Sequence, residues 1–201
     1  MSLLDDVSIV VTPNGVKASK LYAVIPSDGT ADMDVTRATA ATRVDEDGLV
    51  NYAEVVSDTE LVSNGDFATD SDWTLSTGGT DANISNGKAN YIDAAKGQRV
   101  QQNFSFTASK TYKVVFTVSN YVSGKMNFYM GGSYASPSDI DDNGTYIFYH
   151  TPSNNSEAFF RAMQNATLHT FSIDSISVKE ADLNNVPRID YTGGGCPHIL
   201  S

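Results

Sequence analysis

The stretch Thr111-Tyr-Lys-Val-Val-Phe-Thr-Val118 decides the fold of this chain. Every second residue from Tyr112 to Val118 is large and apolar, and polar residues such as Lys113 and Thr117 lie between them. Successive side chains of a strand point to opposite faces, so this alternation predicts a β-strand with one face in a core.

Four further segments outward from this stretch have the same character. They run over residues 124–130, 145–150, 157–163 and 171–178, and they are rich in Val, Ile, Phe and Tyr. Between them lie Ser123-Gly124, Asp141-Asp-Asn-Gly144 and Pro152-Ser-Asn-Asn-Ser156, which supply the residues that tight turns need. Helical periodicity is nearly absent. Short strands at this spacing predict an all-β fold, an antiparallel β-sandwich.

Composition excludes several classes of protein. The 201 residues, enough for one or two domains, carry a net charge of −11, and the basic residues form no run, so we expect no nucleic-acid binding. No apolar stretch approaches the ~20 residues that span a bilayer, so we expect no membrane insertion. The single cysteine, Cys196, excludes a disulfide within the chain. The first residues lack the basic region of a signal peptide, which predicts synthesis in the cytoplasm without one.

The segment from about Glu60 to Glu180 resembles a known family. It begins Leu61-Val-Ser-Asn-Gly-Asp-Phe67, continues through Asp72-Trp73 and ends Phe171-Ser-Ile-Asp-Ser-Ile-Ser-Val-Lys-Glu180. This order is similar to that of the galactose-binding-like jelly-roll family, which includes many carbohydrate-binding modules. The resemblance implies a jelly-roll sandwich and a role in carbohydrate binding.

The two ends of the chain resemble another group of proteins. Ser8-Ile-Val-Val-Thr-Pro-Asn-Gly-Val-Lys17, Ala41-Thr-Arg-Val-Asp-Glu-Asp-Gly-Leu49 and Pro187-Arg-Ile-Asp-Tyr-Thr-Gly-Gly-Gly-Cys-Pro197 resemble phrases that recur in marine phage virion proteins. The resemblance implies a structural protein on the virion surface, a short tail or head fibre or a capsid decoration. It also implies other virion proteins as partners and a homo-oligomer, for which a trimer is the expectation.

These resemblances predict a domain organisation. Residues 1–56 form a β base that attaches to the virion, residues 57–181 form the sandwich, and residues 182–201 return to the base. The sandwich is then an insertion in a small β domain, which needs both ends of the guest to meet at a surface turn. The alternative is a sandwich appended in tandem, with a free C-terminal tail.

Carbohydrate recognition requires outward-facing aromatic and polar side chains. Aromatic faces stack on pyranose rings, while amide and guanidinium groups bond the hydroxyls. Our candidates are Tyr129, Tyr134 and Tyr146, with Asn127 and Arg161 as polar companions. For each tyrosine the alternative is core packing or a cross-strand pair.

The resemblance to carbohydrate-binding modules also implies a structural calcium ion. Asp174 matches the last-strand carboxylate ligand of those modules, and Asn64 and Asp66 lie near the first-strand position. Ala68 stands where relatives usually place an acidic ligand, and losing one anionic ligand weakens a Ca²⁺ site. No other cofactor is expected.

Nothing in the sequence predicts an enzyme. There is no His/Cys cluster with zinc spacing, no nucleophile elbow and no phosphate loop. Acidic residues such as Asp141 and Asp142 lie in turn-rich segments, where Asp caps turns. The expected function is display of a module that binds host-surface glycan weakly and multivalently. The alternative is a capsid decoration or cement protein that binds no glycan.

Overall fold

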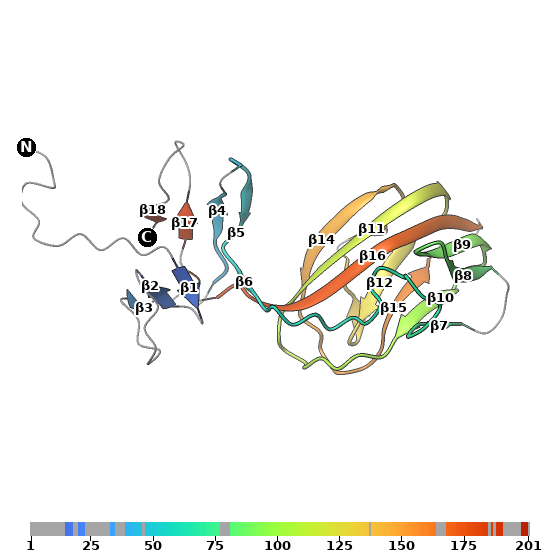
Figure 1. Cartoon of the computed structure of the whole chain (residues 1–201), viewed down its shortest axis with the longest axis horizontal. Helices are drawn as coiled ribbons and strands as arrows, with labels where there is room; N and C mark the ends of the chain where they lie inside the picture. Colours follow the sequence, from blue (N-terminus) through green and yellow to red (C-terminus); the bar gives the residue numbers. More distant parts are fainter. Residues whose placement is uncertain are drawn as a thin grey trace, which may run out of the picture. The chain divides into compact units, whose positions relative to one another are not determined.

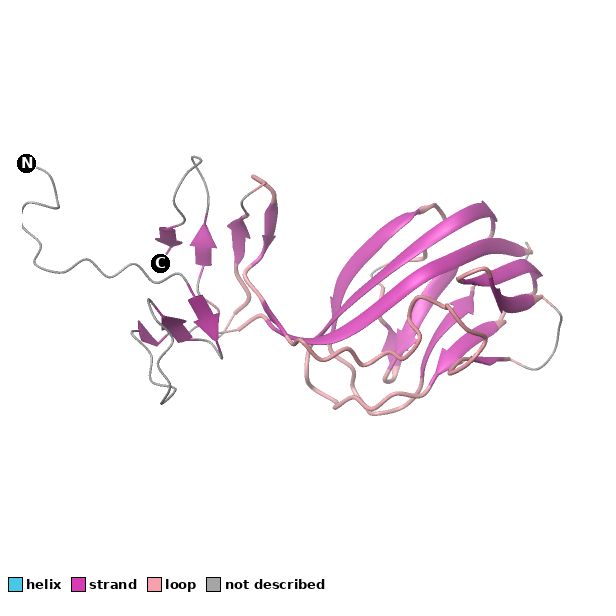
Figure 2. Ribbon diagram, viewed as in Figure 1, coloured by secondary structure: helices cyan, strands magenta, loops and turns pink. Residues whose placement is uncertain are grey.

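The computed structural model describes residues 39–45, 47–76, 81–136, 138–163, 168–184 and 186, together with the backbone of five short strands outside these ranges. The described residues form strands and turns, with no helix, and so include no helix that could cross a membrane (Figure 2). The chain divides into two compact units. The base unit combines residues 1–55 with 182–201, and the sandwich unit is residues 56–181.

The base unit consists of short antiparallel strands from both ends of the chain. Its three-stranded sheet has the order β1 (Gly15–Lys17), β2 (Lys20–Tyr22), β3 (Met33–Asp34). Its two hairpins pair β4 (Thr42–Val44) with β5 (Val50–Tyr52), and β17 (Arg188–Asp190) with β18 (His198–Leu200). The phage-like phrases are therefore described only in part, because residues 8–14, 46, 187 and 191–197 lie outside the described residues.

The turn between β4 and β5 is built from the acidic phrase of the N-terminal region. The Asp45 carboxylate accepts hydrogen bonds from the backbone N–H groups of Asp47 (3.0 Å) and Leu49 (2.8 Å). Gly48 has φ +79°, which an L side chain rarely adopts. Asp45 thus caps a hairpin turn, as the turn chemistry of the sequence predicts.

The sandwich unit has two layers (Figure 1). The five-stranded sheet has the order β13 (Ser133–Tyr134), β12 (Met126–Met130), β15 (Ala158–Ala162), β10 (Arg99–Gln102), β7 (Thr74–Leu75). The six-stranded sheet has the order β14 (Gly144–His150), β11 (Tyr112–Ser123), β16 (His169–Asp182), β9 (Lys88–Ala94), β8 (Ala82–Ser85), with β6 (Val55–Val56) pairing with β16. The predicted all-β, antiparallel jelly-roll sandwich is confirmed.

The core lies between the two sheets and follows the predicted alternation. In β11 the four apolar residues at alternate positions from Tyr112 to Val118 are buried, and the residues between them are half-buried. The Phe116 ring of β11 packs edge-on against Phe160 of β15 with ring centroids 5.2 Å apart, and Phe160 packs against Phe128 at 4.9 Å. The contact of Phe116 with Phe160 thus joins the two layers, and the contact of Phe160 with Phe128 lies within the five-stranded sheet.

Tyr91 of β9 adds a polar tie between the layers. It is buried, stacks on Phe171 with ring centroids 4.6 Å apart, and its hydroxyl donates to the Phe160 carbonyl oxygen at 3.1 Å. Burial raises the pKa of Tyr91 far above its ordinary value, so the phenol stays neutral and the donor is retained.

The two ends of the sandwich unit lie side by side. The Ser57 N–H donates to the Glu180 carbonyl oxygen at 2.8 Å, where β6 pairs with β16. A domain inserted in another needs adjacent ends of this kind. Insertion in the base, as opposed to tandem attachment, stays a prediction that this arrangement permits.

Candidate functional site

The outer face of the five-stranded sheet is the candidate site. In the strand register Phe159 of β15 lies opposite Gln101 of β10 and Tyr129 of β12, and Tyr129 lies opposite Tyr134 of β13. The residues that alternate with them, such as Phe160, point into the core. Four neighbouring strands therefore direct a set of ring and polar side chains away from the core.

Ring contacts join these side chains into a row across the four strands. The Arg99 guanidinium lies 4.2 Å from the centroid of the Phe159 ring. The Phe159 and Tyr129 rings are stacked, with centroids 4.6 Å apart and planes 10° apart. Tyr129 then meets Tyr134 edge-on at 5.6 Å. Such cation–π and ring–ring contacts fix the orientation of each ring before any ligand arrives.

The row changes from buried to exposed along its length. Phe159 is 3% exposed, Tyr129 is half-buried and Tyr134 is 39% exposed. Tyr134 therefore offers a ring to solvent, while Tyr129 packs against it and Phe159 packs against Tyr129. We call Arg99, Phe159, Tyr129, Tyr134 and Arg161 together the aromatic–arginine row.

Arg161 closes the row on the side of Tyr134. Its Nη1 donates to the Tyr134 hydroxyl at 3.0 Å, which positions the phenol. Its Nε is buried and has no hydrogen-bond partner among the described residues. Arg99 lies opposite Arg161 in the register, and its Nη1 is 3.5 Å from a Glu157 carboxylate oxygen.

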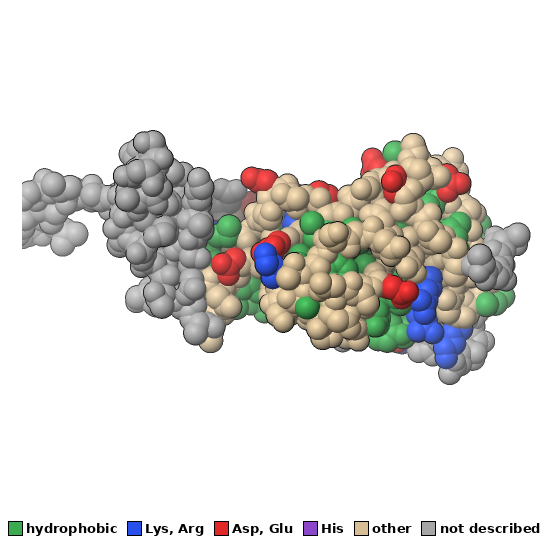
Figure 3. Space-filling model, turned by 90° about the horizontal axis from the view of Figure 1, so that it is seen from below, with side chains coloured by type: hydrophobic (Ala, Val, Ile, Leu, Met, Phe, Trp, Pro, Cys, Tyr) green, Lys and Arg blue, Asp and Glu red, His purple; other side chains and the backbone are tan. Residues whose placement is uncertain are grey.

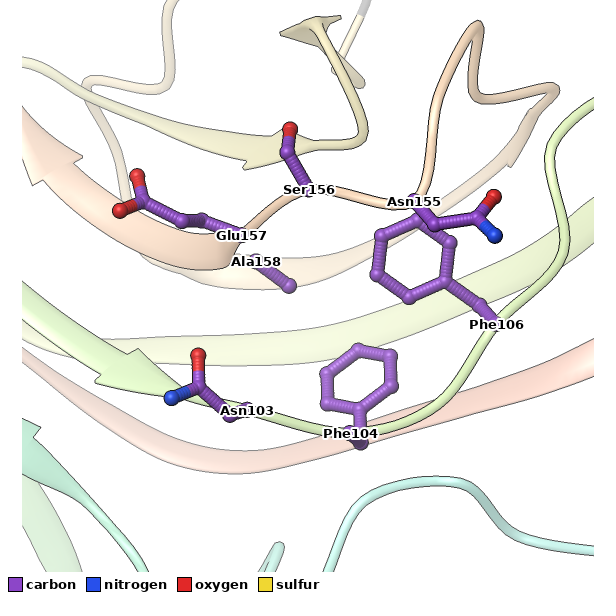
Figure 4. Close-up of a pocket in the computed structure, with 7 residues that line it drawn as sticks. All are labelled: Asn103, Phe104, Phe106, Asn155, Ser156, Glu157 and Ala158. Atoms are coloured by element: carbon purple, nitrogen blue, oxygen red, sulfur yellow. The ribbon is translucent and has the colours of Figure 1, made fainter.

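A pocket of about 200 Å³ opens next to the row. It is lined by Asn103, Phe104, Phe106, Asn155, Ser156, Glu157 and Ala158. Figure 4 shows the Phe104 and Phe106 rings between the amide groups of Asn103 and Asn155. Glu157 borders both this pocket and Arg99, so the pocket and the row form one continuous surface.

The structure brings three of the five predicted glycan-binding residues together: Tyr129, Tyr134 and Arg161 all belong to the row. Asn127 does not join them. Its side chain is 4% exposed, and it bonds the Ser136 hydroxyl and the Ser138 carbonyl oxygen of the segment beside β12. Because these bonds satisfy the buried amide, Asn127 holds that segment in place and offers nothing to a ligand.

Tyr146 lies in the other sheet, on β14, so its assignment to the same site is corrected. Its ring stacks on Phe116 with centroids 5.6 Å apart, and its hydroxyl donates to the Asp142 carbonyl oxygen at 2.9 Å. Burial, and then the charges of Asp142 and Asp141, raise the pKa of Tyr146. Tyr146 therefore packs against the core, which is the alternative role that the sequence left open for each tyrosine.

Two members of the row, Arg99 and Phe159, escaped sequence reasoning. Phe159 stands two positions before Arg161 in an alternating segment, which is a signal that the two side chains share a face. Arg99 joins them only through the pairing of β10 with β15. These strands lie far apart in the sequence: Arg99 and its hydrogen-bond partner Glu157 are 58 positions apart. That pairing could not be deduced from either segment by itself.

Each of the predicted calcium ligands has a hydrogen-bond partner within the protein. Asp174 accepts hydrogen bonds from the Lys88 ammonium, with Nζ 2.9 Å from Oδ1, and from the Ser119 hydroxyl. The positive charge beside this carboxylate therefore comes from a side chain. Among the described residues, no group of three or more His, Cys, Asp or Glu side chains is placed to hold a metal ion.

Asn64 and Asp66 have structural roles in the loop before β7. The Asn64 amide donates to the carbonyl oxygens of Thr69 (2.7 Å) and Ser71 (2.9 Å). Asp66 accepts from the Ala68 N–H at 3.3 Å. Both side chains therefore stabilise the loop that carries them, and the calcium ion that the resemblance implies stays a prediction.

Comparison with known proteins gives structural likenesses alone. No family model matches the chain, and no curated protein matches it. A low-affinity xylan-binding module, CBM86, from Roseburia intestinalis is 18% identical, with a TM-score of 0.40 over 54% of this chain and 89% of that one. A CBM4 module is 17% identical, with a TM-score of 0.41 over 61% and 95%.

A CBM35 module from Paenibacillus barcinonensis is 12% identical, with a TM-score of 0.34 over 70% of this chain and 97% of that one. These likenesses concern the fold, at identities and TM-scores too low to transfer a ligand.

Proposed function

We propose that the sandwich unit is a carbohydrate-binding module whose site is the aromatic–arginine row. The observation that carries the proposal is the exposed Tyr134 ring, held by Tyr129 on one side and by the Arg161 guanidinium at its hydroxyl. An oriented ring stacks on the apolar face of a pyranose, and neighbouring guanidinium and amide groups bond its hydroxyls. An apolar surface with a few fixed polar groups is typical of ligand sites.

The proposed activity is binding without turnover. Glycoside hydrolysis uses two carboxyl groups that face each other across ~5–9 Å. Glu157 is the one acid among the described residues that line the pocket, and Arg99 lies beside its carboxylate. This arrangement favours a recognition surface over a hydrolytic cleft.

The proposal extends to a phage virion. Its support is the resemblance of residues 8–17, 41–49 and 187–197 to phrases of marine phage virion proteins. The base unit docks to other virion proteins as part of a homo-oligomer, with a trimer as the expectation, and the sandwich meets a host-surface polysaccharide. Many copies on one particle turn weak single sites into useful avidity.

A structural role is the second candidate. Tyrosine and arginine side chains gathered on one surface are also typical of the central residues of protein interfaces. In that case the row contacts a neighbouring subunit, and the protein decorates the capsid without binding glycan. The two candidates differ in whether Tyr134 is accessible in the assembled protein.

Titration of the full chain with a panel of bacterial surface polysaccharides tests the proposal. We expect weak saturable binding by calorimetry, lost in Tyr134→Ala because the stacking ring is removed. Tyr149→Ala is the matched control, since Tyr149 lies on β14 in the other sheet. No binding by the folded protein, together with a loss of oligomer mass in Tyr134→Ala, would favour the structural role.

A further inference from the structure

Two arginines face each other on the outer face of the five-stranded sheet. Arg99 of β10 and Arg161 of β15 are direct partners in the antiparallel register, and both side chains are half-buried. Like charges directly opposite in a sheet repel each other. A pair of this kind is therefore stable only if something compensates the two positive charges.

Within the described part of the chain, negative groups compensate the charges of these two arginines only in part. The Glu157 carboxylate lies 3.5 Å from Arg99, and its side chain is 52% exposed, so solvent screens this ion pair strongly. Arg161 forms no ion pair among the described residues, and its Nη1 donates a hydrogen bond to the Tyr134 hydroxyl. Its buried Nε–H finds no acceptor there. The site thus holds two guanidinium groups and one carboxylate, that of Glu157, which lies beside Arg99.

This local excess of positive charge contrasts with the net negative charge of the chain. The protein has 24 acidic and 13 basic residues. Figure 3 shows acidic side chains scattered over one face of the molecule, and basic side chains gathered in few places. A strongly negative protein repels anions in general, so a local pair of arginines favours anions at one place.

We propose that the arginine pair recognises a negatively charged group, a carboxylate or a sulfate, on the bound glycan. The ligand is therefore an anionic polysaccharide. This inference rests on the proposed function, since it names the chemical class of ligand for the same surface. The planar guanidinium group presents several N–H donors in a fork that fits such oxyanions.

The contacts within the row explain how ring and charge act together. Arg161 is held by the Tyr134 hydroxyl, so its guanidinium lies beside the exposed ring. Arg99 is held over the Phe159 ring, and the edge of its guanidinium, of which Nη1 lies beside Glu157, points away from the ring face. A sugar stacked on Tyr134 places a ring substituent next to Arg161, and the next anionic residue of the polymer lies toward Arg99.

The test compares charged and neutral polymers with the full chain. The probes are polygalacturonate for carboxylate, dextran sulfate for sulfate, and unmodified dextran as the neutral polymer, each by affinity electrophoresis at low and high salt. We expect at least one anionic polymer to bind roughly tenfold more tightly than dextran, with binding weakened by salt. Binding to only one of the two anionic polymers identifies the group that is recognised.

Matched variants separate the arginine pair from overall charge. Arg161→Gln and Arg99→Gln each remove one positive charge from the row, and we expect roughly tenfold weaker anion binding for each. Lys179→Gln removes one charge from β16 in the other sheet and should bind as the parent does. Circular dichroism spectra and melting temperatures confirm that each variant is folded.

The outcomes separate this inference from the proposed function. Equal binding of dextran and the anionic polymers, or equal loss in Lys179→Gln and Arg161→Gln, would overturn the anionic ligand and leave carbohydrate binding intact. Absence of binding to every polysaccharide, including the bacterial surface panel, would overturn both.

Discussion

Lys88 shows how one side chain satisfies a carboxylate for which the sequence suggested a metal ion. Its ammonium lies between the Asp174 carboxylate and the Ser119 hydroxyl, joining β9, β11 and β16. Both charged side chains are 30% exposed, so the ion pair is only partly desolvated. A fixed positive charge of this kind neutralises Asp174 without the loss of water that a hard cation would require.

A first prediction follows for Lys88. Lys88→Met should lower the free energy of unfolding by about 1 kcal/mol, because Asp174 loses its charged partner in a partly exposed place. Urea denaturation measures this change. In the parent protein, the melting temperature should be the same with calcium and with a chelator. A calcium-dependent rise that Asp174→Asn abolishes would restore the calcium site and refute this assignment.

At the scale of elements, glycines with positive φ occupy turns between successive strands. Gly124, between β11 and β12, has φ +94°, and a Cβ there would lie 2.5 Å from Cδ2 of the buried His169. Gly87, between β8 and β9, has φ +68°, and a Cβ there would meet nothing nearer than the Asp66 carbonyl oxygen at 3.8 Å. The two turns thus share a left-handed conformation but differ in the space around them.

This difference gives the second prediction. Gly87→Ala should cost about 1 kcal/mol of the free energy of unfolding, from the left-handed backbone alone. Gly124→Ala should cost roughly 3 kcal/mol, because His169 must also move away from the new methyl group. Urea denaturation of the two variants in parallel measures both. Equal costs would show that His169 yields freely and that the contact contributes nothing.

The strands that carry the fold could be predicted because their pattern is local. Alternation over Thr111–Val118 settles which side chains of β11 point inward, whatever the neighbouring strands are. The same rule places Tyr129 opposite the core in β12. It fails for Asn127, which lies on the outer face but is covered by the segment after β13. A strand pattern specifies a face, and what covers that face depends on distant parts of the chain.

The candidate site could be predicted only in part for a related reason. Tyr134 and Arg161 could be singled out as aromatic and basic residues on separate segments, but their contact depends on β12 lying between β13 and β15. Strand order and register are set by the packing of the whole sheet. Arg99 and Phe159 enter the site by the same route, which is why sequence reasoning missed them.

At the scale of the whole molecule, the chain divides into a sandwich unit and a base unit. The apolar core of the sandwich is self-contained, since its buried cluster runs from Val62 to Val178 within residues 56–181. The strands of the base unit come from both sides of this segment. Such an arrangement lets residues 56–181 form a complete core without a contribution from the described residues of the base unit.

The third prediction is that residues 56–181 fold alone. The hydrogen bond between the Ser57 N–H and the Glu180 carbonyl oxygen joins the two ends of the unit, and excision removes only Val55 of β6 and Asp182 of β16 from its strands. We expect the fragment to melt in one cooperative transition, at the temperature of the sandwich transition in the full chain. Differential scanning calorimetry and circular dichroism measure this.

A shorter fragment, residues 56–174, is the control for that experiment. It lacks the part of β16 that pairs with β11 from Thr117 back to Tyr112, and it loses the hydrogen bond from the Ile176 N–H to the Gly65 carbonyl oxygen. Edge groups and core side chains of β11 would then be exposed, so we expect this fragment to stay unfolded. If residues 56–181 also failed to fold, the sandwich would depend on the base for its stability. The two units would then fold together as one cooperative domain.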